Sequence, residues 1–118
     1  MIHNNVKVKW KAKKVVLNSF LSIPNTFTAE IMSEQGFDAL TIDYQHGMIG
    51  FSDLFTMLQS IRNSGVTPIC RVSGLDHAVI SKVMDAGALG IICPMINNRK
   101  QAEQLVQDCK YPPTGIRS

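Results

Sequence analysis

The sequence has no cysteine pair, no phosphate-binding loop and no long apolar run, and each absence excludes a class of protein. Its three cysteines, at positions 70, 93 and 109, form no CxxC pair and have no metal-ligand spacing. No group of glycines has the GxGxxG or Walker-type spacing that cradles a phosphate. No apolar run reaches the roughly 18–20 residues that a membrane span requires. We therefore expect no nucleotide loop, no disulfide framework and no membrane partner.

Aromatic residues are also few, and the basic residues are unevenly placed. The net charge is +3, and five of the twelve basic residues fall in the first fourteen positions. A nucleic-acid interface needs a basic stripe with interleaved aromatics, and only Trp10 accompanies these lysines. We predict no nucleic-acid partner and a solvated basic helix or arm over residues 1–14. Because no apolar signal-peptide core follows these lysines, the expected location is the cytoplasm.

The remainder of the chain alternates between short apolar runs and helical patterns. The composition, 45% hydrophobic and 18% charged over 118 residues, is that of one globular domain. Strands are predicted at residues 15–17, 39–42, 67–72 and 89–93. Helices are predicted to begin at the caps Asn25, Ser52, Asp76 and Asn97 or Asn98, and the first three to end at Gly36, Gly65 and Gly87.

The strand starts are 24, 28 and 22 residues apart, which is the spacing of βα units. Such units form a parallel sheet, since each strand needs a crossover helix before the next one. Two α/β architectures fit, an open doubly wound sheet or part of a (β/α)8 barrel. Four units cannot close a barrel of eight strands and about 250 residues. The chain ends in residues that are typical of a loop, so we expect it to be the first half of a longer protein.

Side chains that can transfer protons or bind anions follow the strands at their carboxyl ends, which is where parallel α/β proteins have their active sites. Asp43 and His46 follow the second strand. A carboxylate three residues before an imidazole can accept its Nδ1 proton and leave Nε2 as a general base. The same D-x-x-H spacing also fits an Asx-type turn with a surface histidine that does no chemistry.

Arg71 ends the third strand, within an apolar context. A guanidinium there could hold a carboxylate bidentately and stabilise an oxyanion, or it could form a structural ion pair with a nearby acid. Asp85 lies in the last turn of a helix, where it opposes the helix dipole. It is either a second site residue or an ion-paired surface acid.

Several segments, taken together and in order, resemble the HpcH/HpaI aldolase family over residues 14–118. They are Leu-Asn-Ser-Phe-Leu-Ser-Ile-Pro, Ala-Glu-Ile-Met-Ser-Glu-Gln-Gly-Phe-Asp, Ile-Asp-Tyr-Gln-His-Gly, Met-Asp-Ala-Gly-Ala-Leu-Gly-Ile-Ile-Cys-Pro-Met and Tyr-Pro-Pro-Thr-Gly-Ile-Arg-Ser. The resemblance covers the N-terminal half of such proteins. It implies that residues 1–118 are the first half of one (β/α)8 TIM-barrel domain of the phosphoenolpyruvate/pyruvate type.

The resemblance also implies a carbon–carbon lyase of class II, which cleaves a 4-hydroxy-2-oxo acid to pyruvate and an aldehyde in aromatic-compound catabolism. By motif position His46 resembles the general base, Arg71 the group that stabilises the pyruvate enolate, and Asp85 the acid that raises the basicity of the histidine. Local spacing favours Asp43 for that last role, since Asp85 ends a helix and should lie near the opposite face of the barrel. Gln45 departs from the family, in which many members have glutamate.

The family's cofactor is a divalent metal, Mg or Mn, and its ligands come from later strands. No residue of this chain matches them, so the chain alone is expected to be inactive. The complete protein is expected to be a homo-oligomer, a hexamer by resemblance, acting on a small 2-oxo acid. The alternatives are a non-catalytic half-barrel that associates with itself or a partner, and a citrate-lyase-like enzyme acting on an acyl-CoA.

Overall fold

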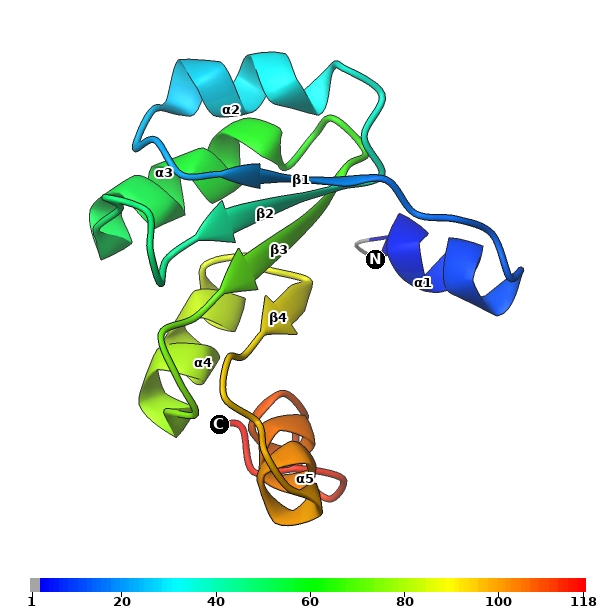
Figure 1. Cartoon of the computed structure of the whole chain (residues 1–118), viewed down its shortest axis with the longest axis vertical. Helices are drawn as coiled ribbons and strands as arrows, with labels where there is room; N and C mark the ends of the chain where they lie inside the picture. Colours follow the sequence, from blue (N-terminus) through cyan, green and yellow to red (C-terminus); the bar gives the residue numbers. More distant parts are fainter. Residues whose placement is uncertain (1–2) are drawn as a thin grey trace.

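A computed structural model describes residues 3–118 of the chain. Its centre is a parallel sheet of four strands in the order β1-β2-β3-β4. The strands are β1 Asn18–Leu21, β2 Ala39–Asp43, β3 Thr67–Arg71 and β4 Gly90–Ile92. The helices are α1 Asn5–Lys11, α2 Thr26–Ser33, α3 Phe51–Ile61, α4 His77–Asp85 and α5 Arg99–Asp108. The predicted order of parallel βα units is therefore confirmed (Figure 1).

Most helix ends follow the predicted capping chemistry. The side chains of Asn25, Asp76 and Asn98 each accept a backbone N–H in the first turn of α2, α4 and α5. The predicted stop glycines Gly36, Gly65 and Gly87 all have positive φ. The cap predicted at Ser52 is wrong. α3 begins after Gly50, whose N–H donates to the Asp53 carboxylate at 2.9 Å.

The first strand lies further along the chain than its β-branched run predicts. Val15, Val16 and Leu17 precede the strand, and Val15 is 88% exposed. The backbone N–H groups of Asp38 and of the next residue donate to the Leu17 carbonyl, and the ladder then begins at the more polar Asn18. Pairing with β2 decided this boundary, and local propensity did not.

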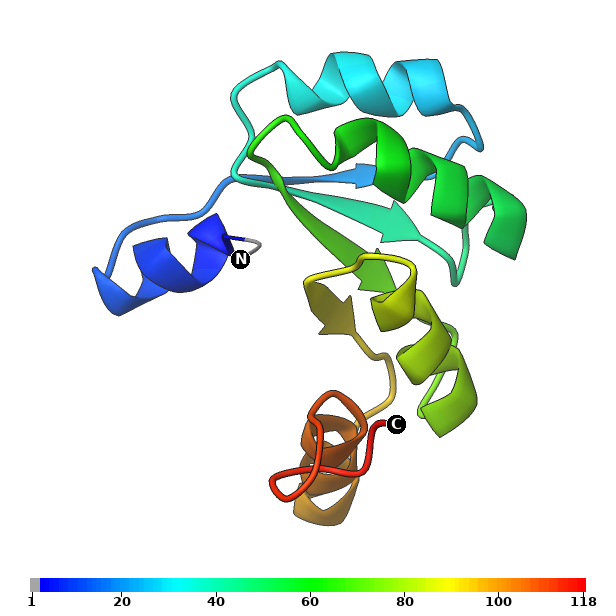
Figure 2. The ribbon, with the colours of Figure 1, turned by 180° about the vertical axis from the view of Figure 1, so that it is seen from behind.

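The main core lies between the sheet and the three helices α2, α3 and α4, which run along one of its faces (Figures 1 and 2). Leu40 and Ile42 of β2 pack there against Leu54 of α3 and Ile80 of α4, and all four are fully buried. Alternate strand residues point to the other face, where Thr41 donates to the Asn18 side chain at 2.9 Å. None of the helices within residues 3–118 combines the length and the apolar character that a bilayer crossing needs.

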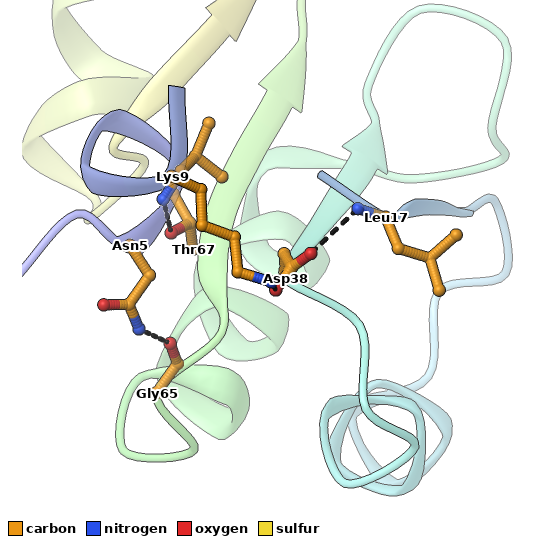
Figure 3. Close-up of polar contacts among 7 residues, drawn as sticks. Asn5, Lys9, Leu17, Asp38, Gly65 and Thr67 are labelled. Carbon is orange, nitrogen blue, oxygen red and sulfur yellow. Dashed lines mark hydrogen bonds and ion pairs between the residues drawn. The ribbon is translucent and has the colours of Figure 1, made fainter. Parts of the chain in front are cut away.

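The basic N-terminal segment was expected to be solvated, but helix α1 docks on the amino-terminal end of the sheet. Val6 is buried, and its N–H donates to the Thr67 hydroxyl at the start of β3. Asn5 donates to the Gly65 carbonyl at 2.7 Å, and Lys9 forms an ion pair with Asp38 (Figure 3). The lysines at 7, 11, 13 and 14 remain exposed. The helix therefore covers the end of the sheet opposite to the predicted site.

Candidate active site

Asp43 and Arg71 end two neighbouring strands and form a bidentate ion pair. The register of β2 and β3 places them side by side, so that both side chains point to the same face. Arg71 Nε donates to Asp43 Oδ1 at 2.9 Å, and Arg71 Nη2 donates to Oδ2 at 2.6 Å. Asp43 is 4% exposed, whereas the Arg71 side chain is 27% exposed. The structure thus anchors the arginine on a buried carboxylate at the carboxyl-terminal rim of the sheet.

Phe20 of β1 supports the same guanidinium from one face. The Arg71 Cζ lies 5.1 Å from the centre of the Phe20 ring, within the range of a cation–π contact. Two of the five N–H donors of the arginine are used by Asp43, which leaves three for a ligand. Sequence patterns missed Phe20, because the misplaced first strand put it in a loop. In the observed register Phe20 pairs with Thr41, two residues before Asp43, so its side chain lies on the same face of the sheet as Arg71.

The Asp43 carboxylate also holds the loop that follows β2. Asp43 Oδ1 accepts the backbone N–H of Gln45 at 3.3 Å and of His46 at 3.1 Å, which is the predicted Asx-type geometry. A Cβ on Gly47 would lie 2.3 Å from the Asp43 carbonyl oxygen, so this turn requires glycine. The His46 side chain is exposed. Within residues 3–118, Asp43 binds the backbone of His46 and not its imidazole ring.

The ion pair changes the acid–base behaviour of both groups. The hydrogen bonds from Arg71 lower the pKa of Asp43 to about 2, with burial opposing and the backbone N–H donors assisting the shift. The hydrogen bond from Asp43 raises the pKa of Arg71. Asp43 therefore stays ionised throughout the neutral range and is a positioning group, since a carboxylate this acidic is a poor proton acceptor.

We expect the contribution of this pair to stability to vanish in acid. Because the folded-state pKa of Asp43, about 2, lies below its ordinary value of 3.8, the pair stabilises the fold above pH 4. That stabilisation, about 2 kcal/mol, is lost as the pH falls through the interval between these two values. Denaturant unfolding of the wild type and of Asp43→Asn between pH 6 and pH 3 measures it. The free-energy difference between the two proteins should shrink toward pH 3, and a constant difference would contradict the assignment.

Asp85 lies at the other end of the sheet from His46, as its position at the end of a helix predicts. It is the last residue of α4, and it lines a surface hollow with Gly65 and Leu89, which precede β3 and β4. Its carboxylate pairs with Arg117 Nη2 at 2.5 Å. The structure therefore brings Asp43 and Arg71 together near His46, whereas Asp85 of the same chain lies at the opposite end of the sheet.

A second acid–base pair, which sequence patterns did not suggest, joins α4 to α5. His77 Nδ1 lies 3.0 Å from Oδ1 of Asp108, which is fully buried. The cysteines offer no reactive thiol, because burial raises the pKa of each of them, to about 12 for Cys70. Within residues 3–118, no three His, Cys, Asp or Glu side chains are grouped so that they could hold a metal ion. The divalent metal that the resemblance implies does not fit the residues present in this chain.

Comparison with known proteins identifies the family. The model of the HpcH/HpaI aldolase/citrate lyase family matches residues 17–118. The chain belongs to this family. The predicted resemblance is thereby confirmed, and the candidate residues Asp43, His46 and Arg71 lie within the matched segment.

Relatives of known name include two aldolases. The chain is 38% identical over 115 residues to a hydroxypyruvate/pyruvate aldolase of Rhizorhabdus wittichii, covering 98% of this chain and 46% of that protein. It is 33% identical over 114 residues to a 4-hydroxy-2-oxo-heptane-1,7-dioate aldolase of Salmonella dublin, covering 97% of this chain and 43% of that one.

Solved structures of the family have the same fold. An HpcH/HpaI aldolase from Desulfitobacterium hafniense superposes with a TM-score of 0.90 at 27% identity, over 98% of this chain and 45% of its own. The citrate synthase SbnG gives 0.91 at 31% identity, over 98% and 47%. The chain thus spans less than half the length of the relatives it matches, and its four βα units correspond to part of their TIM barrels.

Proposed function

We propose that residues 1–118 form the N-terminal half of a single TIM-barrel aldolase domain. The complete protein would be a class II aldehyde-lyase that cleaves a 4-hydroxy-2-oxo acid to pyruvate and an aldehyde. Family membership supports aldolase or lyase chemistry. The observation that carries the finer proposal is the Arg71 guanidinium, which Asp43 holds at the strand rim with three N–H donors left for a ligand.

The chemistry of the cleavage assigns a task to each rim residue. His46 accepts the proton of the substrate's 4-hydroxyl group as the C3–C4 bond breaks. The carbonyl of the aldehyde forms, and the bonding electron pair passes to the enolate of pyruvate. The planar fork of Arg71 binds the carboxylate and the enolate oxygen of that pyruvate unit. Protonation of C3 by the imidazolium of His46 then restores the base and yields pyruvate.

Phe20 and Asp43 act as positioning residues in this proposal, because they touch the guanidinium and not the reacting atoms. The resemblance implies that Asp85 raises the basicity of His46, but Asp85 lies at the far end of the sheet and cannot contact His46 within one chain. Asp43 is closer, since its carboxylate accepts the backbone N–H of His46 in the turn.

We expect the 118-residue chain by itself to have no aldolase activity. The metal ligands that the proposal requires are not grouped within residues 3–118, and a divalent metal, Mg or Mn, would supply charge stabilisation in the complete protein. A retro-aldol assay that couples pyruvate to lactate dehydrogenase tests this on the short chain and on a complete protein that contains it. The complete protein should turn over only with Mg or Mn, and robust turnover by the short chain would refute the proposal.

A second candidate rests on the match to the citrate synthase SbnG. In that case the complete protein would make or break a carbon–carbon bond of a citrate-like acid, with an acyl-CoA as the other reactant. Offering the complete protein a 4-hydroxy-2-oxo acid and, separately, an acyl-CoA with a 2-oxo acid distinguishes the two. Release of free CoA without pyruvate release from the first substrate would favour the second candidate.

We also propose that the complete protein is a cytoplasmic homo-oligomer, a hexamer by resemblance, with a role in aromatic-compound catabolism. Sedimentation of the complete protein tests the hexamer directly.

A further inference from the structure

The loop between β2 and α3, residues 44–50, is held at both of its ends. At its start the Asp43 carboxylate accepts two backbone N–H groups, and the Gly47 N–H donates to the Asp43 carbonyl at 3.1 Å. At its end the Ile49 side chain is buried in the core, and Gly50 is the N-cap of α3. The strands on both sides of this unit are present, because β2 pairs with β1 and with β3 (Figure 1). Contacts within the described residues therefore fix this loop.

Burial alternates along the second half of the loop. His46 and Met48 are exposed, Met48 by 83%, whereas Gly47 is half-buried and Ile49 is only 7% exposed. Residues that alternate in burial in this way project to alternate sides of the chain. Met48 is therefore the large apolar side chain next to the imidazole on the outward side of the loop.

The loops that follow the four strands carry little charge. These loops are residues 22–25, 44–50, 72–76 and 93–98. None of them contains a lysine or an arginine, and their one acid, Asp76, caps α4. Arg71 is the only lysine or arginine in the strands and these loops, and its donors serve Asp43 and the pyruvate unit. A second carboxylate on the substrate would find no cationic partner in these loops, and an unpaired charge against an apolar side chain is costly.

We propose that Met48 is a specificity-determining residue, and that the substrate is a 4-hydroxy-2-oxo acid whose group beyond C4 is apolar and uncharged. This inference rests on the proposed aldolase function, in which Arg71 binds the pyruvate unit and His46 takes the proton of the 4-hydroxyl group. C4 then lies against His46, so the group beyond C4 extends along the outward side of the loop, where it contacts Met48. A thioether side chain is flexible and polarisable, which suits it to pack against alkyl or aromatic groups.

Cleavage of two matched substrates by a complete protein that contains this chain tests the proposal. Both are 4-hydroxy-2-oxo acids with the same number of carbon atoms, and one ends in a methyl group while the other ends in a carboxylate. We expect kcat/KM to be at least about tenfold higher for the methyl compound, the scale on which a hydrophobic contact discriminates. This wild-type ratio tests the class of substrate without any variant.

Two substitutions test the role of Met48 itself. Met48→Arg provides a cation for the distal carboxylate and should lower the ratio of the two kcat/KM values at least about tenfold. Met48→Leu keeps an apolar side chain and should keep the ratio. The change should appear mainly in KM, because the contact is present in the bound substrate as well as in the transition state. Since Met48 is exposed, we expect both variants to fold, and circular dichroism checks this.

Val8→Arg is the matched control, since it puts the same charge on a half-exposed apolar position of α1, at the opposite end of the sheet. It should leave the ratio unchanged. Equal kcat/KM values for the two substrates, or a preference for the dicarboxylate, would overturn the inference and leave the aldolase function intact. The same holds if Met48→Arg changes the ratio no more than Val8→Arg does. If neither compound releases pyruvate in the presence of Mg or Mn, the proposed function itself is wrong, and this inference falls with it.

Discussion

Replacing Arg71 by lysine in a complete protein that contains this chain is expected to lower kcat/KM at least about a hundredfold, the scale of losing one oxyanion donor. The ammonium group keeps the charge but cannot bind Asp43 with two donors and present a fork to pyruvate at the same time. It also forms a poorer contact with the Phe20 ring. The steady-state rate of pyruvate release measures this loss.

Arg99→Lys is the matched control for that experiment. Arg99 also pairs with a carboxylate, that of Glu103, but on the exposed surface of α5, and its conversion should leave kcat/KM unchanged. The structure shows that Arg71 is in an ion pair whatever else it does, so a modest loss of stability is expected from Arg71→Lys. Near-normal kcat/KM in the folded variant would reduce Arg71 to a structural role and remove it from the site.

Asp43→Asn is expected to lower the free energy of unfolding by about 3 kcal/mol, because it leaves the Arg71 guanidinium without an anionic partner in a half-buried position. The amide oxygen can still accept the two backbone N–H groups of the turn, so the variant isolates the ion pair. The melting temperature should fall by roughly 10 °C. Thermal and denaturant unfolding at one fixed protein concentration measure both quantities.

Two comparisons make the Asp43 result specific. Glu103→Gln removes a carboxylate from an exposed arginine pair and should cost less than about 0.5 kcal/mol. In a double-mutant cycle, Asp43→Asn and Arg71→Lys should be non-additive by at least about 1 kcal/mol, since the residues share one interaction. Additive effects, or equal losses for Asp43→Asn and Glu103→Gln, would contradict the buried pair.

Local sequence signals were sufficient to predict the order of the elements and their class. The βα spacing depends on local chemistry, namely capping side chains such as Asn25 and Asp76 and glycines such as Gly36 that adopt positive φ. These signals act within a few residues, so they can be recognised in the sequence without knowledge of the fold. The family segments around Asp43, His46 and Arg71 are also visible in the sequence as motifs, and they predicted the strand ends at which Asp43 and Arg71 meet.

The partners of these residues depend instead on how distant segments pack together. Asp43 could have bound the imidazole of His46 three residues away, but strand register places Arg71 beside it, and a bidentate pair with a guanidinium outcompetes a single bond to a ring nitrogen. The start of β1, the contact of Phe20 with Arg71 and the docking of α1 on Thr67 have the same origin. Each depends on segments far apart in the sequence, whose relative register is set by pairing and burial across the sheet and not by the propensity of any one segment.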